Sequence, residues 1–274
     1  MIADMLAFDF MQRALVGGLM VGLLCAALSF FIVLRRLSFI GVGISHSAFG
    51  GLAIGTLLGI NPFATAAAFA VMVAWGIGFT SRRGALHEDT TIGIFFSTAM
   101  AFGVVLISLS RGYRADLFSL LFGNILAITS QDLLLVAGCT FGVGLFLFLL
   151  FKELLVTTFD EEVARVSGVQ VELIYYGLLT AMALTIVAAI KVVGVILVEA
   201  LLVVPAATGY QLSKNFRFML LFSLLAGALS VLGGLVLSYR FDIPPGATIV
   251  LVAACLFLLA FLFSPSRGIL FSRR

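Results

Sequence analysis

The chain has 274 residues, of which 62% are hydrophobic and only 11% are charged. A soluble domain would carry about 25% charged residues, so this composition excludes a soluble globular protein. The net charge of +3 is too small to indicate a nucleic-acid-binding protein, and we expect no nucleic-acid partner. The composition therefore predicts an integral membrane protein surrounded by lipid.

Stretches with almost no charged residue have the length of about 20 residues that a helix needs to cross a bilayer. They are Ala14–Leu34, two helices within Leu37–Ser81 separated at Asn61-Pro62, Thr90–Ser110, Leu133–Phe151, Leu173–Ile190, Val192–Ser213, Phe218–Tyr239 and Ile243–Ser266. A shorter stretch, Leu117–Gln131, contains Gly123 and Asn124 and predicts a half-helix at the outer surface. The expected fold is an all-α polytopic membrane protein with about nine transmembrane helices, forming a single domain over residues 1–274.

The distribution of basic residues predicts the orientation, because cytoplasmic loops carry an excess of Lys and Arg. With the C-terminus inside, the inner basic residues are Arg35, Arg36, Arg82, Arg83, Lys152, Arg165, Lys214, Arg217, Arg267, Arg273 and Arg274. The outer ones are Arg13, Arg111, Arg114, Lys191 and Arg240. We therefore expect a cytoplasmic C-terminus.

The one sizeable inner segment covers residues 152–172 and is too small to be an enzyme domain. The spacing of Phe159, Val163 and Val166 suits a short amphipathic helix along the inner surface. An ordinary solvated loop fits the pattern equally well.

Two ionisable residues lie well inside the predicted spans, where such groups are costly. His46 lies ten residues after Arg36 and Glu199 lies eight residues after Lys191. At helical rise these spacings place His46 about 15 Å and Glu199 about 12 Å from opposite surfaces, near the midplane of the bilayer. One interpretation is contact with a cation that crosses the membrane, and the other is a structural hydrogen bond.

Small or helix-breaking residues accompany both positions. Ser45 and Gly50 lie beside His46, and Pro205 follows Glu199. Small residues can open a path or let helices pack closely. Proline frees backbone carbonyls, although it is also tolerated in membrane helices that have no such role.

The chain contains no GxxxxGK[ST] motif for binding ATP and no HExxH motif. We therefore expect a transport protein rather than an enzyme. A proton-driven carrier would be expected to bury several carboxylates, and this chain has one candidate. An external motor subunit is the favoured source of energy.

Five motifs occur in the order that is typical of one family. They are RRLSFIGVGISHSAFGG, HEDTTIGIFFSTAMAFGVVLIS, LLFGNILAIT, FDEEVARVSGV and VVGVILVEALLVVPAATG. Together they resemble the membrane permease subunits of bacterial zinc, manganese and iron ABC importers, over about residues 14–263. The resemblance implies an importer permease in the bacterial cytoplasmic membrane that works by alternating access, with a transported zinc, manganese or iron ion and no permanently bound cofactor.

The resemblance also implies partners: a second copy of the chain, a cytoplasmic ABC ATPase dimer and an extracytoplasmic metal-binding protein. The segment at 152–172 would couple the permease to the ATPase. The residues to which this role is carried over are Phe159, Asp160, Glu161, Glu162, Ala164, Arg165 and Gly168.

One position departs from the family pattern, which places Asp four residues before the His. Here Gly41, Ser45 and His46 match, but the Asp position holds Val42. Our hypothesis is that Glu199 supplies the carboxylate that Val42 cannot, so that His46 and Glu199 are the metal ligands. The alternatives are an ABC permease for a metal chelate or vitamin, and an ion-coupled secondary carrier.

Overall fold

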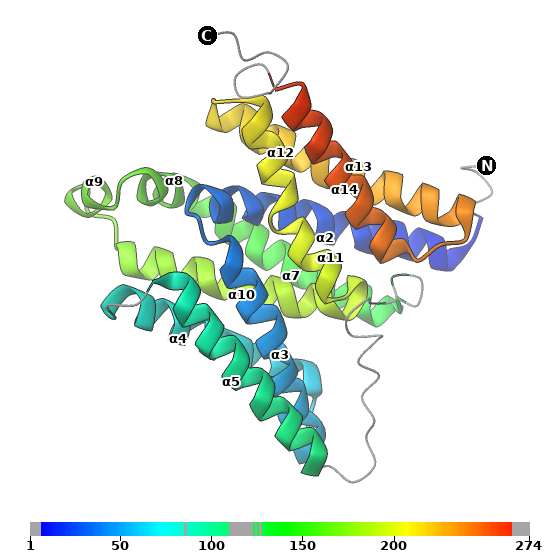
Figure 1. The fold of residues 1–274 in the computed structure, drawn as a ribbon, viewed down its shortest axis with the longest axis horizontal. Helices are drawn as coiled ribbons and strands as arrows, with labels where there is room; N and C mark the ends of the chain where they lie inside the picture. Colours follow the sequence, from blue (N-terminus) through cyan, green and yellow to red (C-terminus); the bar gives the residue numbers. More distant parts are fainter. Residues whose placement is uncertain (1–6, 85–86, 110–122, 124, 126–127, 265–274) are drawn as a thin grey trace. The chain divides into compact units, whose positions relative to one another are not determined.

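The computed structural model describes residues 7–84, 87–109, 123, 125 and 128–264. Within these ranges the regular structure is helical, and no strand occurs. The helices are α2 (Asp9–Leu34), α3 (Ser38–Leu58), α4 (Pro62–Arg83), α5 (Glu88–Leu109), α7 (Ser130–Leu149), α8 (Phe151–Phe159), α9 (Glu161–Val166), α10 (Val171–Val193), α11 (Val195–Leu201), α12 (Val204–Leu212), α13 (Phe216–Phe241) and α14 (Pro245–Leu262) (Figure 1).

Nine segments of the described chain are long and apolar enough to cross a membrane, with α11 and α12 together forming one of them. Each corresponds to one predicted span, so the expected all-α polytopic fold is confirmed. The predicted division at Asn61-Pro62 is also correct. The Asn61 side chain accepts hydrogen bonds from the backbone N–H groups of Phe63 and Ala64, at 3.0 and 3.3 Å, and so caps α4.

The helices group into two compact units. The first unit takes residues 1–36, 118–141 and 189–274. In it α13 packs against α2, α12 and α14 (Figure 1). The α2–α13 crossing is close because both helices carry glycine there: a Cβ at Gly227 would lie 2.8 Å from the Ala26 Cβ, and one at Gly22 would lie 2.7 Å from a Val231 methyl group.

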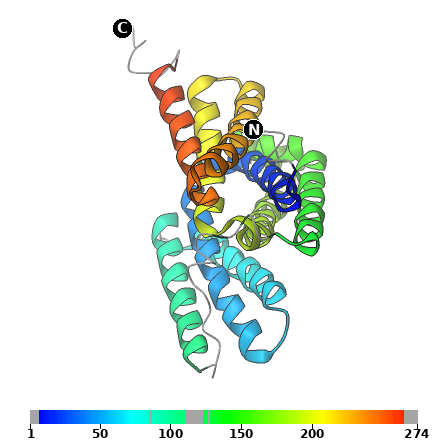
Figure 2. The same ribbon diagram turned by 90° about the vertical axis from the view of Figure 1, so that its right-hand side faces the viewer.

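The second unit takes residues 37–117 and 142–188. Its α3, α4 and α5 lie side by side, α3 packing against both of the others (Figure 2). A Cβ at Gly51 would lie 2.6 Å from the Ala66 Cα, and one at Gly55 would lie 2.5 Å from the Pro62 Cα. Small residues thus bring the α3 and α4 backbones into direct contact.

The predicted half-helix over Leu117–Gln131 falls mostly outside the described residues. Of those that are described, Ile125 and Ile128 are buried, and Gln131 already belongs to α7. Gly123 packs so closely against the backbone of Val193 and Gly194 that a Cβ would overlap it. This contact places Gly123 against the junction between α10 and α11.

Candidate functional site

His46 lies in the middle of α3 and is half-buried. Its Nδ1 is 3.1 Å from the Val42 carbonyl oxygen and 3.3 Å from the Ser45 hydroxyl, which itself donates to the same carbonyl at 3.0 Å. Because a carbonyl only accepts, the contact with Val42 is a hydrogen bond in the tautomer that carries its proton on Nδ1, in which Nε2 keeps the lone pair. An N–H bond to a backbone carbonyl orients many metal-binding histidines in this way.

The surroundings of His46 come from the packing of α3 against α4 and α5. The His46 ring meets the edge of Phe96 in α5, with ring centroids 5.1 Å apart. Ser45 is buried. Gly50, which was predicted to line a path, lies at a tight helix contact: a Cβ there would be 2.9 Å from the Phe69 ring and 3.0 Å from the Ala99 carbonyl oxygen. Its small size therefore serves close packing, one of the two interpretations of such residues.

Glu199 lies in the first unit, on α11, and is half-buried. This helix has seven residues and is broken at both ends. Gly194 precedes it with a φ of 81°, which glycine adopts without steric cost. Irregular backbone at membrane depth is tolerated only where it is buried in protein or lines a cavity. Glu199 therefore lies on a short helix next to irregular backbone, and irregular backbone of this kind also lines transport paths in membrane proteins.

The helix was expected to be interrupted at Pro205, and the structure places the break between α11 and α12 just before this residue. Pro205 is the second residue of α12, and the chain leaves helical geometry at Leu202 and Val203. Proline lacks an N–H and its ring clashes with the carbonyl four residues earlier, which explains the early break. The Ser29 hydroxyl of α2 donates to the Val203 carbonyl at 3.3 Å and accepts from the Ala206 N–H at 3.2 Å.

The described residues contain no group of three or more His, Cys, Asp or Glu side chains able to hold a metal ion.

The segment at 152–172 contains two short helices, α8 and α9, where a single helix was expected. Asp160 separates them: its extended backbone ends α8, and its carboxylate accepts from the N–H groups of Glu162 and Val163 at 2.9 and 3.0 Å. This side chain therefore caps the start of α9. Asp160 thus shapes the segment through a local hydrogen-bonding role.

Gly168 ends α9 in the left-handed conformation, with φ 82°. Its N–H donates to the Arg165 carbonyl at 3.1 Å, and the Val169 N–H donates to the Ala164 carbonyl at 3.0 Å, the pair of bonds that defines a Schellman cap. Ala164 is fully buried. Ala164 and Gly168 therefore hold α9 in place, and neither presents a side chain outward.

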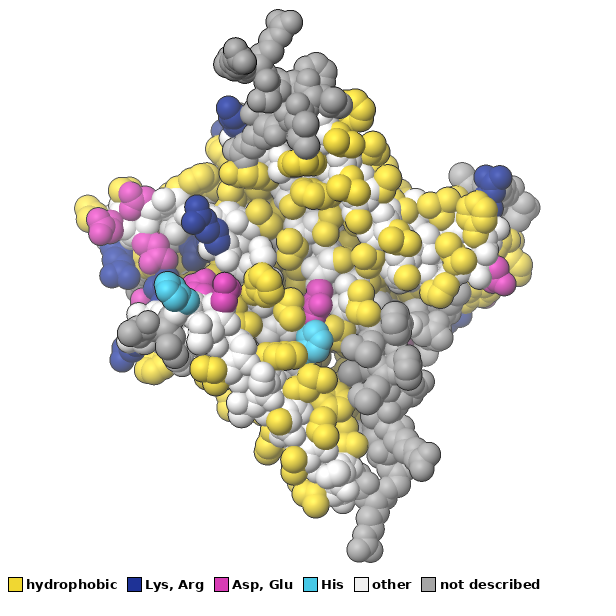
Figure 3. Space-filling model, viewed as in Figure 1, with side chains coloured by type: hydrophobic (Ala, Val, Ile, Leu, Met, Phe, Trp, Pro, Cys, Tyr) yellow, Lys and Arg dark blue, Asp and Glu magenta, His cyan; other side chains and the backbone are white. Residues whose placement is uncertain are grey.

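The outward face of this segment is apolar and flanked by charge. Phe159, Val163 and Val166 are exposed, Val166 at 90%. Glu162 and Arg165 are exposed beside them and Glu161 is half-buried. Figure 3 shows charged side chains gathered over α8, α9 and the adjacent end of α4. Exposed apolar patches rimmed by charged residues mark protein–protein or membrane interaction sites.

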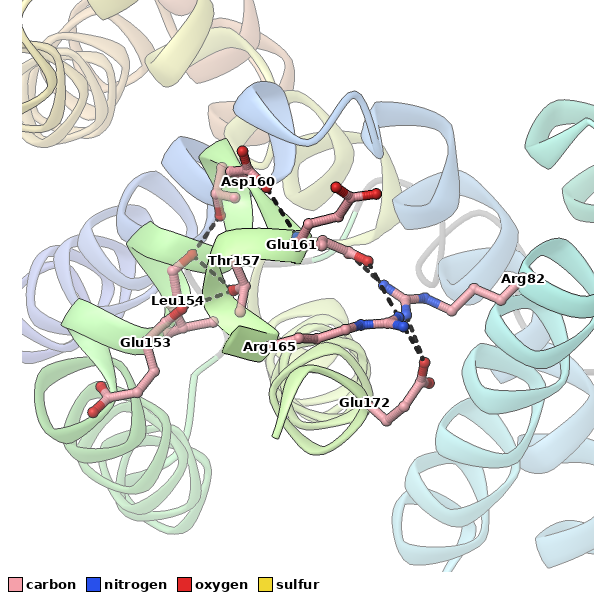
Figure 4. Close-up of polar contacts among 10 residues, drawn as sticks. Arg82, Glu153, Leu154, Thr157, Asp160, Glu161, Arg165 and Glu172 are labelled. Atoms are coloured by element: carbon pink, nitrogen blue, oxygen red, sulfur yellow. Dashed lines mark hydrogen bonds and ion pairs between the residues drawn. The ribbon is translucent and has the colours of Figure 1, made fainter. Parts of the chain in front are cut away.

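Arg82, at the end of α4, was expected only to be one of the inner basic residues. Its guanidinium binds Glu161 at 2.5 Å and Glu172 at 2.8 Å (Figure 4). The guanidinium carbon also lies 3.9 Å from the centre of the Tyr175 ring. Arg165 extends the cluster, with Glu172 at 3.8 Å. The signal available in the sequence was that these charges share one predicted side of the membrane.

Nine apolar spans, a broken helix that carries a half-buried acid, and a charged segment with an apolar face are together typical of a multi-pass transport permease. The chain matches the model of the ABC 3 transport family over residues 7–264. It is 39% identical to the manganese transport system membrane protein MntC of Halalkalibacterium halodurans, a match that covers 97% of this chain and 91% of that protein. It is 38% identical to the manganese import system permease protein ScaB of Streptococcus parasanguinis, covering 95% and 92%.

Among solved structures, PsaBC from Streptococcus pneumoniae in complex with Fab has the same fold. The TM-score is 0.86, with 36% sequence identity over 97% of this chain and 98% of that chain. The chain belongs to the ABC 3 transport family. The resemblance drawn from the five motifs is therefore confirmed, and the chain is a transport component that crosses the membrane several times.

Proposed function

We propose that this chain is the permease subunit of an ABC importer for a divalent transition metal, with manganese as the first candidate. The observation that carries the proposal is the imidazole of His46, held in the middle of a membrane span with Nδ1 directed to a backbone carbonyl. An imidazole and a carboxylate without thiolate suit manganese, iron or zinc. The manganese transport proteins among its relatives favour manganese within this class.

His46 and Glu199 are the proposed ligands, and Ser45 supports the orientation of the imidazole. Val42 contributes its carbonyl to that orientation but has no side-chain oxygen for the ion. A second copy of the chain, related by two-fold symmetry, would supply the same groups again. No resident cofactor is proposed, because the metal is the cargo.

The proposed partners are that second copy, a cytoplasmic ABC ATPase dimer and an extracytoplasmic metal-binding protein. The exposed apolar face of Phe159, Val163 and Val166 supports docking of another protein at this segment. Glu162 and Arg165 beside it offer charges that could select the partner. The proposed location is the cytoplasmic membrane of a bacterium, with the C-terminus inside.

The testing experiment is manganese uptake by proteoliposomes that contain the full chain, its ATPase and the delivery protein. His46→Ala should lower ATP-dependent uptake by at least about tenfold, because metal sites depend strongly on single ligands. The amount of permease in the membrane should stay the same. His87→Ala is the matched control, since the only other histidine lies at the start of α5 and should not affect uptake.

Normal uptake by the His46→Ala variant would exclude His46 as an essential ligand. Uptake that needs no ATP and collapses with an uncoupler would indicate the ion-coupled carrier instead. Uptake restricted to chelated metal or a vitamin would indicate the larger-ligand permease. Zinc and iron tested in parallel identify the ion.

A further inference from the structure

Arg82 joins three parts of the second unit. Its two terminal nitrogens bind different carboxylates, Glu161 at the start of α9 and Glu172 at the start of α10 (Figure 4). The guanidinium carbon also lies over the Tyr175 ring. The Arg82 side chain is only 20% exposed, so it is held more firmly than a free surface charge. Only a planar fork with several donors can make these three contacts at once.

Arg82 ends a continuous contact between α4 and α10. Trp75, Gly78 and Arg82 lie on one face of α4, at helical spacing. The Trp75 Nε1 donates to Thr180 Oγ1 at 2.9 Å, and a Cβ at Gly78 would lie 2.6 Å from a Leu179 methyl group. The cytoplasmic half of α4 therefore contacts the first part of α10 through three residues, Trp75, Gly78 and Arg82.

The same α4 is packed without space against α3, which carries His46. Gly51 and Gly55 bring the two backbones together, and the Ile77 side chain of α4 lies 3.4 Å from the position of a Cβ at Gly43. Packed helices of this kind move as one body because well-packed contacts do not deform continuously. A displacement of α9 that reaches Arg82 therefore reaches the helix of His46.

We propose that Arg82 is the positioning residue that transmits movement of the α8–α9 segment to the α3–α4 pair. This inference rests on the proposed function, in which an ATPase docks on that segment. Arg82 binds Glu161. Glu161 lies on the side of α9 that is away from the exposed Val166, so Arg82 does not belong to the apolar face on which the ATPase is proposed to dock. It acts through α4 and does not touch the ion.

The test uses the full chain reconstituted with its ATPase and delivery protein, and it measures manganese ions transported per ATP hydrolysed. Arg82→Gln keeps a polar side chain but removes the charge and the guanidinium fork, and should lower this ratio about fivefold, within the range by which single residues alter coupling. Co-purification of the ATPase should be unchanged. Arg83→Gln is the matched control, because Arg83 is exposed and lies over the Phe79 ring.

A second pair of variants separates transmission from docking. Val166→Asp changes the exposed face and should abolish co-purification of the ATPase. Arg82→Lys keeps the charge without the planar fork and should give a ratio between those of the wild type and Arg82→Gln. If Arg82→Gln does not accumulate in the membrane, Glu161→Gln with Glu172→Gln removes the same ion pairs from exposed or half-exposed positions and should lower the ratio equally.

An unchanged ratio in Arg82→Gln, or in the double Gln variant, would overturn the role of Arg82 while leaving the proposed function intact. Loss of ATPase co-purification in Arg82→Gln would also overturn it, since Arg82 would then act in docking. A wild-type chain without ATP-driven manganese uptake would contradict the proposed function and this inference with it.

Discussion

Ser29 is the residue that makes the break between α11 and α12 compatible with a membrane interior. Its hydroxyl donates to the Val203 carbonyl, which also accepts from the Ala207 N–H, and it accepts from the Ala206 N–H at the start of α12. Unsatisfied backbone groups cost several kcal/mol in an apolar interior. One side chain of α2 therefore supports the geometry of the helix that carries Glu199.

Replacing Ser29 with Ala removes both hydrogen bonds and leaves the buried Ala206 N–H unpaired. We expect a loss of about 1–3 kcal/mol of stability, the usual cost of an orphaned buried group. Thermal unfolding of the purified protein in detergent measures this as a lower midpoint. Ser230→Ala is the control, because Ser230 is equally buried but donates only to Ala226 within its own helix. Equal midpoints for the two variants would contradict the role of Ser29.

At the scale of elements, the α3–α4 pair depends on glycine more than on any polar contact. The absence of a side chain at Gly51 lets the Ala66 and Phe69 region of α4 approach directly. Such small-residue interfaces replace the hydrophobic driving force that helices lack in lipid. The orientation of His46 depends on this packing because His46 lies on α3.

Gly51→Ala should therefore separate α3 from α4 and destabilise the protein by about 1–3 kcal/mol, the range for overpacked cores. The same thermal measurement applies, together with the amount of folded permease in the membrane. Gly93→Ala in α5 is the matched control, because a Cβ there meets nothing within 4 Å. It should be neutral or stabilise by up to about 1 kcal/mol through helix propensity. If the Gly51→Ala variant is as stable as Gly93→Ala, the α3–α4 contact accommodates the added methyl group without loss of stability, and the prediction is wrong.

For the whole molecule, the number of spans and the distribution of basic residues decide the orientation. Nine spans in the described chain agree with the count on which the predicted inside C-terminus depends. Each additional or missing span would reverse every later loop, so the position of the C-terminus is a sensitive test.

A fluorescent reporter fused after Arg274 should be active, because that reporter folds only in the cytoplasm, and a periplasmic phosphatase at the same point should be inactive. The matched control places both reporters after Asp242, in the turn between α13 and α14, where the pattern should reverse. The same reporter active at both points would contradict the predicted orientation.

Composition and periodicity alone determined that this is a multi-pass membrane protein, where its spans lie, and which two ionisable residues, His46 and Glu199, fall inside them. They could do so because lipid imposes a length and an apolar composition on every spanning helix, and because a charge at that depth is rare. Proline chemistry likewise placed the break after Glu199.

Only the tertiary structure decided which polar groups work together. Glu161 and Glu172 are 79 and 90 residues from Arg82, and Ser29 is 174 residues from Val203, so no local spacing relates them. The Nδ1 proton of His46 follows from the carbonyl that its ring meets, and the two-helix form of the 152–172 segment follows from the Asp160 cap. The bilayer sets the length and composition of each helix, but contacts between helices form only when the helices pack together. The order of residues along one helix does not show which other helix it will contact.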